Sequence, residues 1–166
     1  MYQDKSENQF ELMARRLPDA IAVMRGDAAH ENIEGTVKLY QTTRGVLVVA
    51  EMMGLPIASE PCQDNIFALH IHSGTSCTGN EQDAFADALT HYDPEGCPHP
   101  YHAGDLPPLF GAGDLAFLAV LTNRFALDEV IGKTLILHDR PDDFTSQPSG
   151  NAGGKIACGV ITRVAR

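Results

Sequence analysis

The sequence predicts an all-β domain, built as a sandwich or barrel of antiparallel strands. Seven segments rich in β-branched and apolar residues have the length of strands and are bounded by Gly, Pro, Asn or Asp. No long helical pattern lies between them, which indicates antiparallel rather than alternating β and α structure. The predicted strands cover residues 20–24, 36–40, 45–53, 66–72, 115–121, 134–138 and 155–164.

Helix and loop make up the rest of the chain. Short helical segments are predicted at residues 8–17, within 82–89 and at 127–131, and two long irregular stretches cover 73–108 and 139–154. Long loops inside a compact domain are usually functional or disordered. With 166 residues, of which 43% are hydrophobic, the chain fits one domain with a single core. We therefore expect one domain over 1–166, with 1–19 as an N-terminal extension.

Charge and hydropathy narrow the classes of partner and the compartment. The formal net charge is −10, so nucleic acid and anionic membrane surfaces would repel the protein at long range. No segment approaches the roughly 20 apolar residues that span a bilayer, and the first residues lack the pattern of a secretion signal. We expect no nucleic-acid and no membrane partner. A cytoplasmic location is expected, or a periplasmic or extracellular one if a signal has been removed.

Three of the seven histidines lie in predicted strands or at their ends. Residues i and i+2 of a strand point to the same face, so His70 and His72 present two imidazoles side by side while Ile71 points to the core. His138 ends the strand TLILH in a similar way. Such pairs on a rigid strand are suited to holding a metal.

A proline-rich loop holds three more histidines and an aspartate. His99, His102 and Asp105 are spaced by three residues, and His91 lies eight residues before His99. Three imidazole nitrogens and one carboxylate suit a closed tetrahedral zinc site. Imidazole ligands favour zinc or copper over calcium or magnesium, which prefer oxygen. The loop is therefore predicted to be a metal site rather than a disordered linker.

Together, these motifs match one family. In order along the chain they read HIH, HYDP, H-x2-H-x2-D, LILHDRPDD and GNAGGKIACGVI. The chain resembles the copper/zinc superoxide dismutases from about Ala20 to its C-terminus, with the greatest likeness to the bacterial branch. The resemblance implies an immunoglobulin-like Greek-key β-sandwich, or flattened barrel, with long metal-binding and active-site loops.

The resemblance also assigns metals to the histidines. Copper would be held by His70, His72, His91 and His138. Zinc would be held by His91, His99, His102 and Asp105, so that His91 would bridge the two metals. Asp142 would accept hydrogen bonds from one copper histidine and one zinc histidine, which fixes the orientation of their rings.

The sequence alone does not determine the chemical state of the four cysteines. Four are too few for a disulfide scaffold, and alone they could be buried thiols, bridges or metal ligands. The resemblance implies a disulfide between Cys77 and Cys158. The state of Cys62 and Cys97 stays open, although we expect no metal role for Cys97 because four zinc ligands are already present.

The implied activity is the dismutation of superoxide to dioxygen and hydrogen peroxide, with His91 as ligand and proton carrier. Lys155 takes the place of the family's active-site arginine and would supply positive charge for the anionic substrate. The alternative is a protein of the same fold that stores copper or binds zinc alone, with little or no turnover. The resemblance also allows a homodimer.

The chain departs from the family pattern at a few further positions. Family glycines near the first copper ligand and just before the bridging histidine are replaced by Ala68, Leu89 and Thr90. The segment between His99 and His102 is shorter than in most relatives. Local repacking is expected to absorb these changes.

Overall fold

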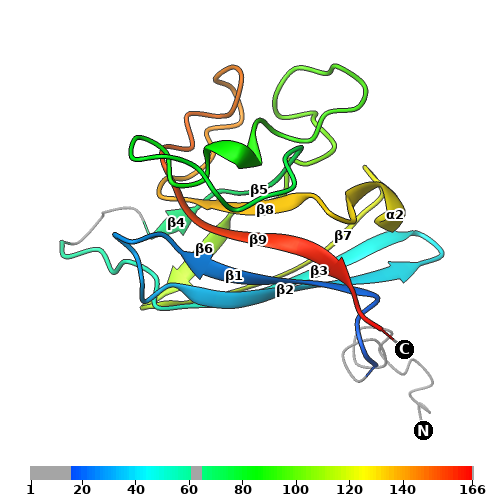
Figure 1. Ribbon diagram of the computed structural model, residues 1–166, viewed down its shortest axis with the longest axis horizontal. Helices are drawn as coiled ribbons and strands as arrows, with labels where there is room; N and C mark the ends of the chain where they lie inside the picture. Colours follow the sequence, from blue (N-terminus) through cyan, green and yellow to red (C-terminus); the bar gives the residue numbers. More distant parts are fainter. Residues whose placement is uncertain (1–15, 61–64, 166) are drawn as a thin grey trace, which may run out of the picture.

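The computed structural model describes residues 16–60 and 65–165 and is nearly all β (Figure 1). Its strands form one antiparallel sheet with the order β4-β6-β7-β3-β2-β1-β9-β8-β5. The strands are β1 (Ala20–Gly26), β2 (Glu34–Thr42), β3 (Gly45–Met53), β4 (Ile66–Phe67), β5 (Leu69–His72), β6 (Leu109–Ala112), β7 (Leu115–Thr122), β8 (Thr134–His138) and β9 (Lys155–Arg163).

The sheet is rolled into a nearly closed barrel. Its two edge strands, β4 and β5, are separated in the chain by Ala68 alone, although they stand at opposite ends of the strand order. Only a rolled sheet can bring both of its ends to one short stretch of chain. After β3 the chain crosses to a different part of the sheet, so that β3 pairs with β7. The predicted all-β, flattened-barrel fold is confirmed.

Alternating side chains of β1, β2 and β3 fill the barrel. Residues that point inward are almost fully buried, and their sequence neighbours are largely exposed or half-buried. Because of this period of two, each strand packs one apolar face against the core and turns its other face toward solvent. The inward residues of the three strands are Ala20, Ala22, Met24, Val37, Leu39, Val46, Val48, Ala50 and Met52.

In contrast, β5 and β8 are buried on both faces. Their inward side chains, among them Ile71 and Leu137, join the core, and their outward side chains are covered by loops. Figure 1 shows the two long loops, drawn in green and orange, on the same side of the barrel beyond β5 and β8. A polar site that is shielded from bulk water can therefore form between these strands and the loops.

Some predicted boundaries were wrong. The segment 66–72 is split at Ala68, and β6 was not predicted because four residues after a proline pair carry little periodicity. The predicted helices shrink to a 3-10 turn at Ala86–Ala88 and to α2 (Leu127–Val130). Most of the helix predicted at 8–17, and most of the extension 1–19, lies outside the described residues. Neither described helical segment is long and apolar enough to cross a membrane.

Candidate metal centre

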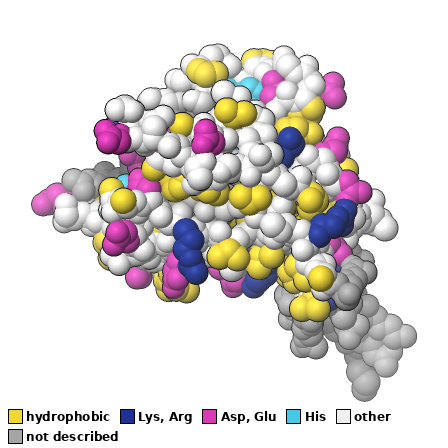
Figure 2. Space-filling model, in the orientation of Figure 1, with side chains coloured by type: hydrophobic (Ala, Val, Ile, Leu, Met, Phe, Trp, Pro, Cys, Tyr) yellow, Lys and Arg dark blue, Asp and Glu magenta, His cyan; other side chains and the backbone are white. Residues whose placement is uncertain are grey.

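Strands β5 and β8 form the rigid base of the site. His70 and His72 point outward from β5, on the face opposite to Ile71, as the strand period predicts. His138 stands at the end of the neighbouring strand β8. All three imidazoles are buried, with exposed fractions of 0%, 2% and 4%. On the face of the molecule in Figure 2, correspondingly little histidine surface is visible.

The long loop that follows β5 returns over this base. Isolated β-bridges join His72 to His91 and His70 to Asp105. These bridges bring four loop side chains onto the strand histidines. Two clusters result, each with its ligand atoms within 4.8 Å of one another. We call them the copper group (His70, His72, His91, His138) and the zinc group (His91, His99, His102, Asp105); they share His91.

Each histidine of the copper group offers one buried ring nitrogen that has no hydrogen-bond partner among the described residues. These atoms are Nδ1 of His70 and Nε2 of His72, His91 and His138. A buried polar atom without a partner is costly, and native proteins rarely leave several together. Four that converge within one cluster are suited to a metal ion with imidazole ligands.

The opposite nitrogens of the three strand histidines are anchored. Nε2 of His70 lies 2.8 Å from Oδ2 of Asp142, and Nδ1 of His72 donates to the carbonyl of Leu89 at 2.8 Å. Nδ1 of His138 lies 3.4 Å from the carbonyl of Gly153. Such contacts set the tautomer, and they leave the unpartnered nitrogen as the one with a free lone pair.

Burial keeps these imidazoles neutral. Desolvation, together with the smaller effect of neighbouring histidines, lowers the pKa of His72 to about 2 and that of His138 to about 3. Desolvation also lowers the pKa of His70, although its hydrogen bond to Asp142 opposes the shift. Neutral imidazole is the form that binds a metal. These three strand histidines are thus ready to coordinate a metal at any pH near neutrality.

The zinc group has the dimensions of a tetrahedral site. Nδ1 of His91 and Nδ1 of His102 lie 3.3 Å apart. A zinc ion with ligand bonds of 2.0–2.1 Å separates its ligands by about 3.3 Å. Asp105 completes the set, since its Oδ1 lies 2.7 Å from Nδ1 of His91 and its Oδ2 lies 3.0 Å from Nδ1 of His99. The donors and their spacing therefore fit zinc.

Asp142 connects the two groups. Its Oδ2 contacts Nε2 of His70 and its Oδ1 contacts Nε2 of His99, each at 2.8 Å. Burial raises the pKa of this carboxyl, but hydrogen bonds from His70, from the Phe144 amide and from His99 outweigh burial and lower it to about 2. Gly150 makes room for the contact, because a Cβ there would lie 2.0 Å from Oδ1 of Asp142.

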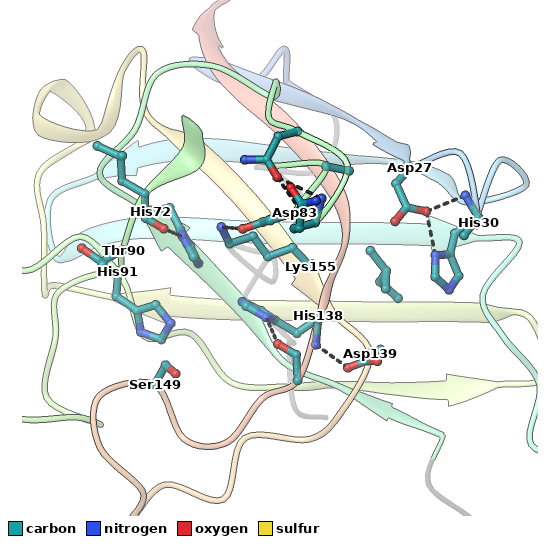
Figure 3. Close-up of a pocket in the computed structure, with 18 of the residues that line it drawn as sticks. Asp27, His30, His72, Asp83, Thr90, His91, His138, Asp139, Ser149 and Lys155 are labelled. Atoms are coloured by element: carbon teal, nitrogen blue, oxygen red, sulfur yellow. Dashed lines mark hydrogen bonds and ion pairs between the residues drawn. The ribbon is translucent and has the colours of Figure 1, made fainter. Parts of the chain in front are cut away.

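A pocket gives access to the copper group. His72, His91 and His138 line it, together with Lys155 (Figure 3). Lys155 does not point freely into this pocket, because its ammonium donates to Oδ2 of Asp83 at 2.7 Å and to the carbonyl of Phe85 at 3.0 Å. The sequence did not reveal this pairing, since the two partners are 72 residues apart.

A disulfide ties the loop after β5 to β9. Cys77 and Cys158 are bonded, as the resemblance implied, and they close 81 residues of chain. Cys97 is a half-buried free thiol, and Cys62 lies outside the described residues. In the chain-entropy view a loop of this length stabilises the fold by about 4.5 kcal/mol.

Arg124 also contributes to the site, although the sequence did not indicate this. One nitrogen of its guanidinium, Nη1, lies within hydrogen-bond distance of three backbone carbonyls of the zinc loop, those of Pro100, His102 and Asp105. These distances are 2.9, 3.3 and 3.2 Å. Nothing in the sequence pairs this arginine with the loop, because backbone acceptors leave no trace in residue type.

Fold and site together define a β-barrel protein with two adjoining metal groups that share one histidine. The family model for copper/zinc superoxide dismutase matches residues 33–161. "Superoxide dismutase [Cu-Zn] 2" of Aquifex aeolicus is 33% identical over 142 residues, which are 76% of this chain and 78% of the relative. "Superoxide dismutase [Cu-Zn]" of Actinobacillus pleuropneumoniae is 34% identical over 142 residues, or 76% and 71% of the two chains.

A solved structure of similar fold is a member of the same family. The Cu/Zn superoxide dismutase from Brucella abortus superposes with a TM-score of 0.70 at 25% identity, over 85% of this chain and 98% of that one. The chain belongs to the copper/zinc superoxide dismutase family.

Proposed function

We propose that this protein is a superoxide dismutase that carries copper and zinc. The observation that carries the proposal is the set of four unpartnered buried nitrogens in the copper group, next to a zinc group of tetrahedral dimensions. Family membership supports the same activity, since the relatives are named as superoxide dismutases. All four residues expected to bind copper and all four expected to bind zinc come together in the structure.

In the overall reaction, two superoxide anions and two protons give one dioxygen and one hydrogen peroxide. Copper, when bound, supplies the one-electron oxidation and the one-electron reduction. The chain supplies the pocket, the fixed ring orientations and a place for a proton. That place is Nε2 of His91, which belongs to the copper group while Nδ1 of the same ring faces Asp105 at 2.7 Å. His91 can therefore hold a proton within reach of the substrate without leaving the zinc group.

The other residues keep this arrangement rigid. Asp142 orients one ring of each group, and the zinc group anchors the loop that supplies His91. Zinc has no redox chemistry, so its part is to fix the loop and to tune His91. Lys155 supports substrate binding with positive charge on the pocket wall.

Metal content and superoxide consumption, measured on the same purified sample, test the function. The protein should bind one copper and one zinc and should consume superoxide catalytically, whereas a zinc-only sample should not. The variant His138→Ala should lose copper and activity but keep zinc, because His138 belongs to the copper group alone. A fully copper-loaded protein without turnover would contradict the function and favour a copper store.

We propose further that the protein acts as a homodimer in an oxidising compartment, away from nucleic acid and membranes. Exposed Phe110, Leu115 and Phe117 on β6 and β7 offer apolar surface to a second copy. Light scattering tests the dimer, and the mass of a single chain would contradict it.

The disulfide supports the proposal of an oxidising compartment, because a reducing one would break the bond between Cys77 and Cys158. The net charge of −10 supports the exclusion of nucleic acid and anionic membranes as partners.

A further inference from the structure

The pocket over the copper group is bordered by more acidic than basic side chains. Among the described residues that line it there is one ammonium, that of Lys155. The carboxylates that line it belong to Asp27, Glu81, Asp83, Asp93 and Asp139. A small anion that enters therefore meets a field that the metals and Lys155 must overcome. The capture of anions therefore depends on the ion pair that Lys155 forms with Asp83.

Asp83 holds Lys155 in a defined place. The ammonium donates to Oδ2 of Asp83 at 2.7 Å and to the carbonyl of Phe85 at 3.0 Å, and the side chain of Lys155 is only 16% exposed. Asp83 is fixed in turn, because its Oδ1 accepts from the amide of Phe85 at 2.9 Å. Burial raises the pKa of Asp83, but the hydrogen bonds from Lys155 and from the Phe85 amide outweigh burial and lower it below its ordinary value, so the carboxylate is charged.

The ion pair lies beside the copper group. Lys155 is the strand partner of His138 across β8 and β9. In Figure 3 the pair lies on the wall of the pocket that also presents His72 and His138. A change in the charge of either partner is therefore felt where an anion would bind.

We propose that Asp83 positions the ammonium of Lys155 and offsets its charge at the copper pocket, and that it thereby limits the capture of small anions. Only the identity of the natural anion, superoxide, rests on the proposed function. Asp83 acts through Lys155, so it is a positioning residue rather than a catalytic one.

A purely structural role is the rival explanation. The loop that carries Asp83 is already joined to β9 by the disulfide between Cys77 and Cys158, three residues beyond Lys155. If the ion pair served only as a second tie for this loop, its loss would lower thermal stability and leave anion affinity unchanged. The two roles are therefore separable by a measurement of anion binding.

Azide binding to the copper- and zinc-loaded protein, followed by the visible absorption of copper at low ionic strength, is the test. We expect Asp83→Asn to tighten azide binding by about three- to tenfold, because the ammonium of Lys155 is then no longer neutralised by an ion pair and can approach the anion. Asp83→Glu should stay near the wild type, since it keeps the charge. Glu81→Gln is the matched control, as it removes one charge from the same pocket lining without removing either partner of Lys155, the Asp83 carboxylate or the Phe85 carbonyl, and it should give a smaller gain.

A double-mutant cycle shows whether Asp83 acts through Lys155. In a Lys155→Met background, the gain from Asp83→Asn should fall to that of Glu81→Gln. An equal gain in both backgrounds would overturn the proposal, and so would unchanged azide affinity at full metal content.

Superoxide kinetics separate this proposal from the proposed function. Under the same conditions kcat/KM for superoxide should rise with azide affinity in Asp83→Asn, and the gain should shrink with added salt. Tightened azide binding in a protein that never consumes superoxide would overturn the proposed function and leave the role of Asp83 in place.

Discussion

Oδ2 of Asp142 lies 2.8 Å from Nε2 of His70, and both side chains are fully buried. The other oxygen of the same carboxylate lies 2.8 Å from Nε2 of His99. One side chain thus orients a ring of the copper group and a ring of the zinc group. Because the pKa of Asp142 is lowered to about 2, the carboxylate stays ionised and accepts from both rings at every physiological pH.

Asp142→Asn should weaken metal binding. The amide keeps the shape of the carboxylate but replaces one acceptor oxygen with a donor, so only one of the two histidines stays oriented. Loss of such a contact typically reduces metal affinity by about 10- to 100-fold. Competition with a chelator, read separately for copper and zinc, measures the effect. A remote variant, Asp114→Asn, serves as control, and unchanged affinity for both metals in Asp142→Asn would contradict the prediction.

Asp105→Ala should release zinc more readily than copper. Asp105 is the one anionic member of the zinc group and is absent from the copper group. Binding to a structural zinc site contributes directly to folding free energy, so thermal stability should fall together with zinc occupancy. Metal analysis after dialysis against a chelator checks this expectation. Full zinc occupancy with unchanged stability would show that the zinc assignment is wrong.

Arg124→Ala should loosen the zinc loop without removing a ligand. The variant leaves three backbone carbonyls of the loop without their guanidinium partner. The side chain is exposed, so each lost contact should cost no more than about 1 kcal/mol. We expect faster zinc release and greater hydrogen exchange at residues 100–105. Arg25→Ala, which breaks an exposed ion pair with Glu34, is the control and should change neither.

The sequence was most informative where function depends on spacing within one element. The placement of His70 and His72 on one face follows from the strand period alone, and so does the burial of Ile71 in the core. The spacing of His99, His102 and Asp105 pointed to zinc before any fold was known. Likeness to a family was needed to join these elements, because nothing within the chain says which loop returns to which strand.

Contacts between distant loops could not be predicted in this way. The ion pair of Lys155 with Asp83 and the contacts of Arg124 with backbone carbonyls depend on how two loops pack in space. Neither leaves a periodic signal. The sequence placed Lys155 correctly at the start of β9, but the charge that an anion meets there is set by its partner. Net charge and residue type alone therefore say little about attraction at the pocket.

The metal-free protein should lose stability as the pH falls. The pKa of His72 is lowered to about 2 and that of His138 to about 3, both from an ordinary value of 6.5. Between pH 6.5 and about 3 the unfolded chain therefore binds more protons than the folded one, so the free energy of unfolding declines as the pH falls. Each histidine contributes up to about 1.4 kcal/mol per pH unit. Urea unfolding of the apo-protein measures this slope, and a flat profile from pH 6.5 to 4 would contradict it.

Leu89→Gly should stabilise the protein. Leu89 has φ 63° and ψ −141°, in a region that glycine visits freely and residues with a Cβ rarely adopt. Its carbonyl anchors His72, so the surrounding structure holds it there. Such strain costs roughly 1–3 kcal/mol, whereas the extra backbone freedom of glycine costs about 0.5–1 kcal/mol. The side chain is 58% exposed, so little burial is lost. We expect a net gain of about 1 kcal/mol in the free energy of unfolding, which corresponds to a rise in Tm of about 2–4 °C. Leu89→Ala keeps the Cβ and should show no gain, and a glycine variant less stable than the alanine variant would refute the strain.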